Sequence, residues 1–321
     1  MLSMFSTLNL FSKECIPILI TSFNRPDLLE KVLGVVSYSN CQNIYFATDG
    51  PKNLIDEKKI SECEKILFQF YPNITSNQIL KHEFNLGCRL AMARNISWFF
   101  NQVEVGIVLE DDCLPSPSFF DYMIDTLEQF KHNEEIFMVS GYSPITWQNQ
   151  ENLRMSIYPL VWGWGSWSDR IIKYELDFKD HKDLVAKAEV LGLQSVWGFF
   201  GRVKWRLLMK MAGIGALDTW DYSLTATAWR NRKYCIHTSI NYIENIGFRD
   251  DATHTRKKAP KWAKRDFGKG TRSANCNTAM RYGPDQAEFD FELGLQIFGT
   301  NFNGWLRLKL SLLKNKKLWM R

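Results

Sequence analysis

The sequence predicts an α/β fold in which a mostly parallel sheet is flanked by helices. Short apolar runs that end at turn residues alternate with helical patterns through the first half of the chain, which is typical of such a sheet. The apolar share of 45% and the charged share of 23% are those of an ordinary globular protein. With 321 residues, the chain can bury a large core in one domain or in two fused ones.

The first strand, helix and strand follow from local chemistry. Residues 16–22 are a short apolar run, and we expect a helix from Arg25 to about Val36 after it. Pro26 suits the first turn of that helix, where no amide hydrogen is needed. Residues 43–48 predict a second strand, which ends at the turn sequence Asp49-Gly50-Pro51.

The same alternation continues to residue 140. The expected elements are helices at 56–70, 87–100 and 118–130, and strands at 79–82, 105–109 and 136–140. Strands and helices that alternate in this way pack as a parallel sheet between helices.

The second half of the chain changes in character, so we divide the sequence at residue 150. Residues 1–150 are expected to form one half and residues 151–301 another, which is rich in Trp and holds helices near 183–191 and 203–211. Residues 253–284 have a loop-like, basic composition. The Trp surplus fits a site that stacks on rings, and a Trp-rich core explains it nearly as well.

Residues 302–321 predict a separate C-terminal helix. They hold six Lys or Arg and no acid, interleaved with Leu and Trp. A basic amphipathic helix of this kind can lie on an anionic membrane surface. A packed terminal helix with a solvated basic face explains the pattern equally well, so peripheral contact with the inner membrane face stays open.

Composition also limits the partners and the compartment. The net charge of +5 is mild and does not indicate a nucleic-acid partner. The seven cysteines are scattered and show no spacing typical of zinc, so we expect free thiols in a reducing compartment. No stretch approaches the roughly 18 consecutive apolar residues of a membrane span, and no signal peptide is evident. These features together predict a cytoplasmic protein.

Three consecutive acids, Glu110, Asp111 and Asp112, follow the apolar run 105–109. Ligand sites in open α/β sheets lie outside the carboxyl ends of strands. Adjacent carboxylates repel one another unless a divalent cation or several donors neutralise them. No Gly-rich phosphate loop is present, so phosphate would have to be held by a metal, Arg or Lys. The pattern favours a metal site that grips a phosphorylated donor, with a solvated acidic turn as the alternative.

Six short segments carry a resemblance to a known family. They are residues 16–25, 47–52, 106–120, 163–167, 219–222 and 246–254. In this order they resemble the inverting N-acetylglucosaminyltransferase family of N-glycan synthesis and its bacterial nucleotide-sugar transferase relatives. The resemblance implies a GT-A fold, which is Rossmann-like, a divalent cation (typically Mn²⁺), a nucleotide-diphosphate sugar donor such as a UDP-sugar, and inversion at the anomeric carbon.

The resemblance also implies roles for individual residues. Asp112 would be the direct metal ligand, and His254 would lie next to the metal or the diphosphate, although a lone loop histidine is more often structural. The donor-binding residues implied are Ser22, Arg25, Asp49, Glu110, Asp111 and Trp164. A mixture of carboxylate and imidazole suits manganese better than calcium. For Trp164, a tightly packed turn in the core is the alternative to a platform beside the sugar.

Inversion needs a general base for the acceptor hydroxyl, and Asp221 is the candidate. Its aromatic neighbours Trp220 and Tyr222 would desolvate it and raise its pKa. Asp218, three residues away, would share a helix face with it. The family has two adjacent acids where this chain has Tyr222 in the second position, and an N-cap role for Asp221 is the alternative.

The sequence therefore predicts a metal-dependent glycosyltransferase that moves a sugar from a nucleotide-diphosphate donor to a glycan or lipid-linked acceptor, in the synthesis of a bacterial surface polysaccharide or lipid-linked glycan. One alternative is a sugar nucleotidyltransferase, which usually needs a Gly-rich N-terminal loop that residues 22–26 lack. The other is a non-catalytic sugar-binding protein, which would leave the acids at 110–112 without a purpose.

Overall fold

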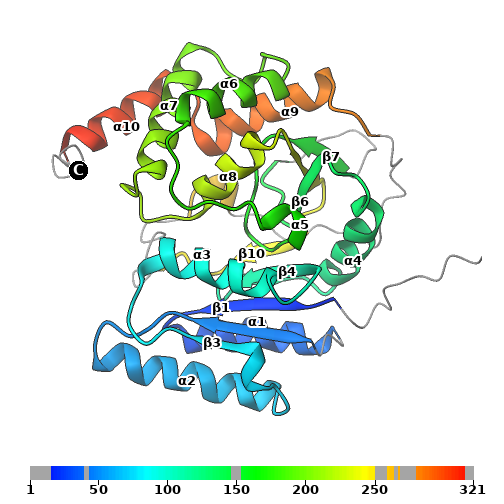
Figure 1. Ribbon diagram of the computed structural model, residues 1–321, viewed down its shortest axis with the longest axis vertical. Helices are drawn as coiled ribbons and strands as arrows, with labels where there is room; N and C mark the ends of the chain where they lie inside the picture. The colour runs from blue at the N-terminus through cyan, green and yellow to red at the C-terminus, as the bar shows by residue number, and fades with distance from the viewer. Residues whose placement is uncertain are drawn as a thin grey trace, which may run out of the picture.

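An eight-stranded mixed sheet forms the centre of the protein, with helices on both faces (Figure 1). The computed structural model describes residues 16–39, 43–145, 153–249, 259–263, 267 and 280–314. The strands, in their order across the sheet, are β3 (Ile79–Lys81), β2 (Ile44–Thr48), β1 (Ile18–Ser22), β4 (Val105–Glu110), β8 (Trp164–Trp167), β6 (Ile136–Ser140), β9 (Tyr234–Thr238) and β7 (Leu153–Ser156). The predicted α/β class is confirmed.

Six of the strands point the same way. β3, β2, β1 and β4 pair in parallel, and β6 pairs in parallel with β9. β8 lies antiparallel between β4 and β6, and β7 is antiparallel to β9 at the edge. Strands from residues 1–150 and from residues 151–301 therefore share one sheet. A short second sheet pairs β5 (Cys113–Pro115) with β10 (Ile243–Asn245).

The helices of the first half lie close to their predicted positions. They are α1 (Pro26–Tyr38), α2 (Leu54–Phe70), α3 (Gly87–Phe100) and α4 (Phe119–Phe130). Local signals explain their starts, because Pro26 opens α1 and the Asn53 side chain accepts hydrogen bonds from the amides of Ile55 and Asp56 at the start of α2.

Most helices of the second half lie in the upper part of the molecule, and α5 lies near its middle (Figure 1). They are α5 (Ser168–Ile171), α6 (His181–Leu191), α7 (Phe199–Gly213), α8 (Asp221–Arg230), α9 (Pro284–Leu293), a π-helix (Gly294–Phe298) and α10 (Phe302–Lys314). The predicted helices at 183–191 and 203–211 correspond to α6 and α7. Of the predicted C-terminal helix, residues 302–314 are helical, and residues 315–321 lie outside the described residues. Most of the basic segment 253–284 lies outside them as well.

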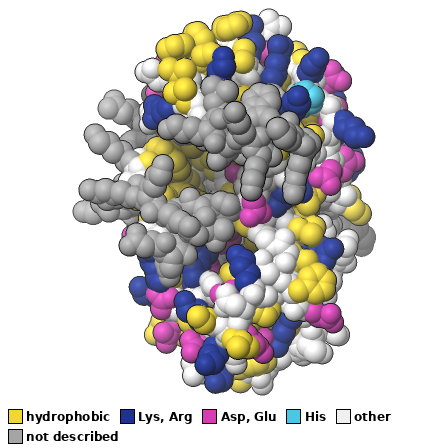
Figure 2. All heavy atoms as spheres, turned by 90° about the vertical axis from the view of Figure 1, so that its left-hand side faces the viewer, with side chains coloured by type: hydrophobic (Ala, Val, Ile, Leu, Met, Phe, Trp, Pro, Cys, Tyr) yellow, Lys and Arg dark blue, Asp and Glu magenta, His cyan; other side chains and the backbone are white. Residues whose placement is uncertain are grey.

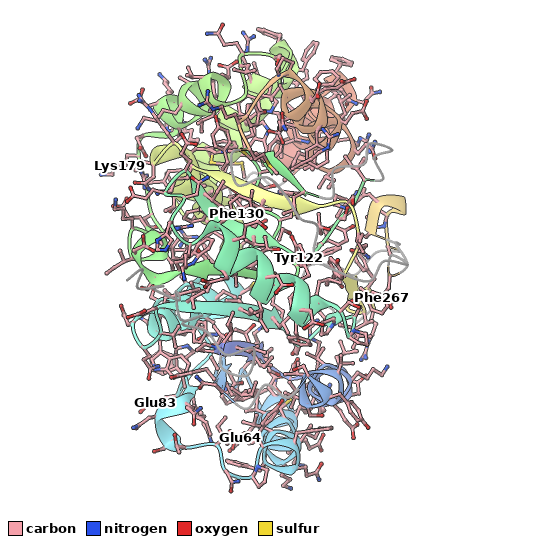
Figure 3. All side chains as sticks on the ribbon, turned by 90° about the vertical axis from the view of Figure 1, so that its right-hand side faces the viewer. Glu64, Glu83, Tyr122, Phe130, Lys179 and Phe267 are labelled. Carbon is pink, nitrogen blue, oxygen red and sulfur yellow. The ribbon has the colours of Figure 1, made fainter. Side chains whose placement is uncertain are left out.

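Two apolar clusters cover the two faces of the sheet. Side chains alternate along a strand, so Ile18 and Ile20 of β1 join one cluster while Leu19 joins the other. The first cluster includes buried residues of α1, α2 and α4, and the second includes those of α3. Figure 3 shows α4 lying along the sheet with Tyr122 and Phe130 labelled on it, and both side chains are buried. The sheet is thus a rigid support for the residues at its strand ends.

Many of the Trp side chains lie in the hydrophobic core. Trp197, Trp205 and Trp229 are buried and contact one another, with ring centroids 4.9 to 5.9 Å apart. Tyr158 stacks on Trp205 and accepts a hydrogen bond of 2.5 Å from the indole nitrogen of Trp197. Among the helices that the structure describes, none is both long enough and apolar enough to cross a membrane.

Candidate functional site

A cavity of about 240 Å³ lies at the carboxyl ends of β1 and β4. From β1 the chain leads to β2 on one side, and from β3 it returns to β4 on the other side, so the strand order reverses between β1 and β4. Such a switch point is where open α/β sheets bind ligands. Eight residues predicted for the site line the cavity: Ser22, Arg25, Asp49, Glu110, Asp111, Asp112, Asp218 and Asp221.

Arg25 joins two of the three consecutive acids. Its guanidinium forms an ion pair with Asp111 and a second one, of 2.7 Å, with Asp112. The second oxygen of Asp111 accepts hydrogen bonds from the Ser22 hydroxyl at 3.1 Å and from the amide of Phe23 at 3.3 Å. Donors from the end of β1 therefore hold Asp111, which is 1% exposed, in place.

The acids differ in how well they are compensated. Burial alone would lower the pKa of Arg25, but the charges of Asp111 and Asp112 outweigh it and raise that pKa, so Arg25 stays charged. Burial raises the pKa of Asp111 against the opposing effect of Arg25. Burial and the charge of Asp112 raise the pKa of Glu110, whose side chain forms no hydrogen bond or ion pair with a described residue. Of Glu110 and Asp111, Glu110 is therefore the acid better able to take up a proton.

Asp49 organises the opposite wall. Its carboxylate accepts hydrogen bonds from the amides of Gly50, Leu86 and Gly87 and from the Asn85 side chain, all between 2.8 and 3.0 Å. These bonds fix the start of α3, where Gly87 has a φ of +78° that other residues rarely adopt. Asp49 thus lines the cavity while its own oxygens are occupied by the chain.

One face of α3 forms a wall that sequence reasoning missed. Gly87, Cys88, Ala91, Met92 and Asn95 line the cavity. Cys88, Ala91, Met92 and Asn95 have the spacing of one helix face, and that spacing was the available signal. Lys52, with its ammonium 5.4 Å from the centre of the Phe23 ring, also lines the cavity and adds a second cation near Arg25.

The two candidate bases come from the segment before α8. Asp218 is exposed and accepts a hydrogen bond of 3.1 Å from the Arg89 amide, so it caps the first turn of α3. Asp221 is the first residue of α8 and accepts a hydrogen bond from the Thr219 hydroxyl. The N-cap position belongs to Trp220, so the N-cap alternative for Asp221 is wrong. After burial and the nearer charges, the charge of Asp221 also raises the pKa of Glu110 across the cavity.

The prediction that Trp164 contacts a donor sugar is wrong. Trp164 is 0% exposed, and its ring packs 6.1 Å from both Phe100 and Trp220 in the core. Trp164 is the first residue of β8, and Gly163, just before the strand, has a φ of +60°. Trp162, which lies before Gly163 and outside β8, lines the cavity instead. Trp164 is therefore a core residue, as the alternative to a sugar platform stated.

The described residues do not by themselves fit a metal ion. Within the described ranges, no group of three or more His, Cys, Asp or Glu side chains could hold one. Arg25 already neutralises Asp111 and Asp112, so its guanidinium occupies the position beside them in which a metal cation would lie. His254, the predicted second metal residue, lies outside the described residues.

No protein-family model matches this chain, and a search of curated proteins finds no match either.

Proposed function

We propose that this protein is an inverting glycosyltransferase that moves a sugar from a nucleotide-diphosphate donor to a glycan or lipid-linked acceptor. The observation that carries the proposal is the cavity itself, in which acids and Arg25 from the first half face Asp221 from the second half at a topological switch point. A transferase needs this pairing, because one wall must hold an anionic donor while the other activates a hydroxyl.

Arg25 and Lys52 support the donor half of the proposal. Arg25 stays charged beside the acids, and Lys52 lines the same cavity. Two cations there would stabilise the negative charge that builds on the departing nucleoside diphosphate. We keep Ser22, Asp49, Glu110 and Asp111 as donor-side residues, with Ser22, Asp49 and Asp111 acting chiefly by holding that wall in shape.

Asp221 supports the acceptor half. In the proposed reaction its carboxylate takes the proton of the acceptor hydroxyl, whose oxygen forms a bond to the anomeric carbon. The bond from that carbon to the diphosphate breaks, and the nucleoside diphosphate leaves with the electron pair. Asp218 is the second candidate for this role, and its capping bond to α3 makes it the weaker one.

A divalent cation, typically Mn²⁺, remains part of the proposal at Asp112 together with His254. When bound, such an ion would supply positive charge next to the diphosphate. Because Arg25 is paired with Asp112, an incoming cation has to compete with the guanidinium. Whether the protein binds a divalent cation is therefore tested separately from whether it transfers a sugar.

The proposal is tested by isothermal titration calorimetry with a panel of UDP-sugars, with and without Mn²⁺. We expect a UDP-sugar to bind, and Asp112→Ala to remove the Mn²⁺-dependent part of its affinity, by at least about tenfold. Glu288→Ala, an exposed acid of α9, is the matched control and should change nothing. If no nucleotide sugar binds under either condition, the proposed function is wrong. If a UDP-sugar binds equally well with and without Mn²⁺, only the proposed metal requirement is wrong.

A further inference from the structure

A second cavity, of about 510 Å³, lies between α7, the π-helix Gly294–Phe298 and α10. The residues that matter for its chemistry are Lys204, Tyr222, Trp262, Phe298 and Arg307. Among the described residues that line it there is no Asp or Glu. The cavity therefore combines aromatic rings with positive charge and lacks the acids of the first site.

The two cations of this cavity have no acidic partner in the part of the chain that the structure describes. The Lys204 ammonium donates to the carbonyl oxygens of Phe298 and, at 3.1 Å, of Gly299. The Arg307 guanidinium donates to the Asn303 carbonyl, at 3.3 Å, within its own helix. Neither forms an ion pair with a residue that the structure describes, and the pKa of Lys204 is lowered by burial and then by the charge of Arg307. Two cations close enough to repel each other favour a bound anion.

Two contacts link the linings of the two cavities, although no described residue lines both. Asp221 lines the first cavity and its neighbour Tyr222 lines the second. Trp162 lines the first and stacks on Trp262 of the second, with ring centroids 5.6 Å apart and planes at 27°. A molecule in the second cavity would therefore contact Tyr222, the residue that follows the candidate base in α8.

We infer that the second cavity holds the acceptor and is built for a sugar linked to phosphate, an inference that rests on the proposed function. The flat faces of Trp262 and Tyr222 suit the apolar face of a sugar ring, and Lys204 and Arg307 suit the phosphate oxygens. A hydroxyl at the opposite end of the sugar then points toward Asp221. The acceptor proton goes to Asp221, as in the proposed reaction, and the phosphate linkage of the acceptor stays intact.

The phosphate can belong to a soluble sugar phosphate or to a lipid carrier. Figure 2 shows the side of the molecule toward which α10 extends, where Lys and Arg side chains stand beside hydrophobic ones at the upper end. On α10, Phe302 and Leu310 are 47% and 48% exposed. Both sources present the same phosphate and sugar to the cavity, so binding experiments have to separate them.

The test compares glucose 1-phosphate, glucose and inorganic phosphate as probes in calorimetric titrations. Glucose 1-phosphate should bind more tightly than either part alone. Arg307→Gln should weaken that binding about tenfold, because a charge-assisted hydrogen bond is lost. Lys309→Gln is the matched control, since Lys309 lies on the same helix over the Trp305 ring and does not line the cavity. Equal effects of the two variants, or no binding to the wild-type protein, would overturn the inference.

Trp262→Ala separates the two parts of the ligand. It should remove the advantage of glucose 1-phosphate over inorganic phosphate and leave phosphate binding unchanged; loss of both would refute the assigned arrangement. In a flotation experiment with phosphatidylcholine vesicles that contain a polyprenyl phosphate, binding that Arg307→Gln abolishes identifies a lipid carrier. Absence of flotation, with glucose 1-phosphate still bound, identifies a soluble acceptor.

Failure of this inference and failure of the proposed function give different results. If the first cavity does not bind nucleotide sugars, the UDP-sugar titration is blank while the phosphate-linked sugar still binds. If only the second cavity is misassigned, UDP-sugars bind and Arg307→Gln has no effect on any of the three probes.

Discussion

The cavity at the carboxyl ends of β1 and β4 and the interior of the second half use the same kinds of residue in opposite ways. At the strand ends, the side chain of Glu110 lines a cavity and has no hydrogen-bond partner among the described residues. In the interior, Asp290 is 0% exposed and accepts hydrogen bonds from Ser156, from the Ile157 amide at 2.9 Å and from the Tyr282 hydroxyl at 2.6 Å. The Glu110 carboxylate can still accept hydrogen bonds from a ligand in the cavity. The Asp290 carboxylate already accepts three hydrogen bonds from within the protein.

The tryptophans divide in the same way. Trp162 presents part of its ring to the cavity, whereas Trp164 is closed in by Phe100 and Trp220. The comparison teaches that residue type and position in a motif do not decide a role here. What decides it is whether neighbours have already used the polar atoms or ring faces.

The largest expected effect separates Asp221 from Asp218. If Asp221 is the base, Asp221→Asn should lower turnover of a UDP-sugar and acceptor by roughly 10² to 10⁴-fold, because a general base contributes about that much. UDP-sugar affinity should stay within a few-fold. Asp218→Ala should leave turnover nearly intact and lower the melting temperature by removing a helix cap. Steady-state kinetics beside a thermal scan decide between them, and a reversed pattern would make Asp218 the base.

The next prediction concerns Trp164 and Trp162. Trp164→Ala should reduce the free energy of unfolding by about 3 to 5 kcal/mol, because it removes a fully buried ring. Trp162→Ala removes a partly exposed ring, so its cost in stability should be less than half as large while UDP-sugar affinity falls. Urea unfolding and calorimetric titration of both variants test this. Equal stability losses, with no change in affinity for Trp162→Ala, would erase the distinction between the two rings.

Sequence reasoning predicted the parts of the fold that local patterns determine. The strands at 16–22 and 105–109 are short segments rich in apolar residues, and the polar or turn residues that follow them mark their ends. The acids after β4 could be assigned to a cavity because the end of a parallel strand is itself a local feature. β8 and β7 were not predicted, since β8 is a Gly- and Trp-containing segment that reads as a turn and β7 is a four-residue edge strand.

The remaining features of the site depend on tertiary packing. The sequence suggested a cation to neutralise Asp111 and Asp112, but it could not show that Arg25 reaches both. The saturation of Asp49 requires the 85–87 turn to fold against β2 from 36 or more residues away. Which face of α3 meets the cavity likewise depends on how the helix rotates against the sheet, and sequence periodicity alone does not give that rotation.

The smallest effect tests the saturated acid. Burial raises the pKa of Asp290 to about 7, against the opposing hydrogen bonds from Ser156, Tyr282 and Ile157. An aspartate in an unfolded chain has a pKa of about 3.9. The folded protein therefore keeps a proton that the unfolded chain releases, so this contribution to stability is full below about pH 4 and is lost as pH rises through about 7.

Asp290→Asn should remove that dependence. Relative to the variant, the free energy of unfolding of the wild-type protein should fall by roughly 1 kcal/mol per pH unit between about pH 4.5 and 7. Asp285→Asn, at an exposed position of the same helix, is the control and should track the wild type. Urea unfolding at a series of pH values measures all three proteins. Parallel curves for wild type and Asp290→Asn would mean that Asp290 stays ionised when buried, and its three donors would then compensate a full charge, as Arg25 does for Asp111 at the carboxyl ends of β1 and β4.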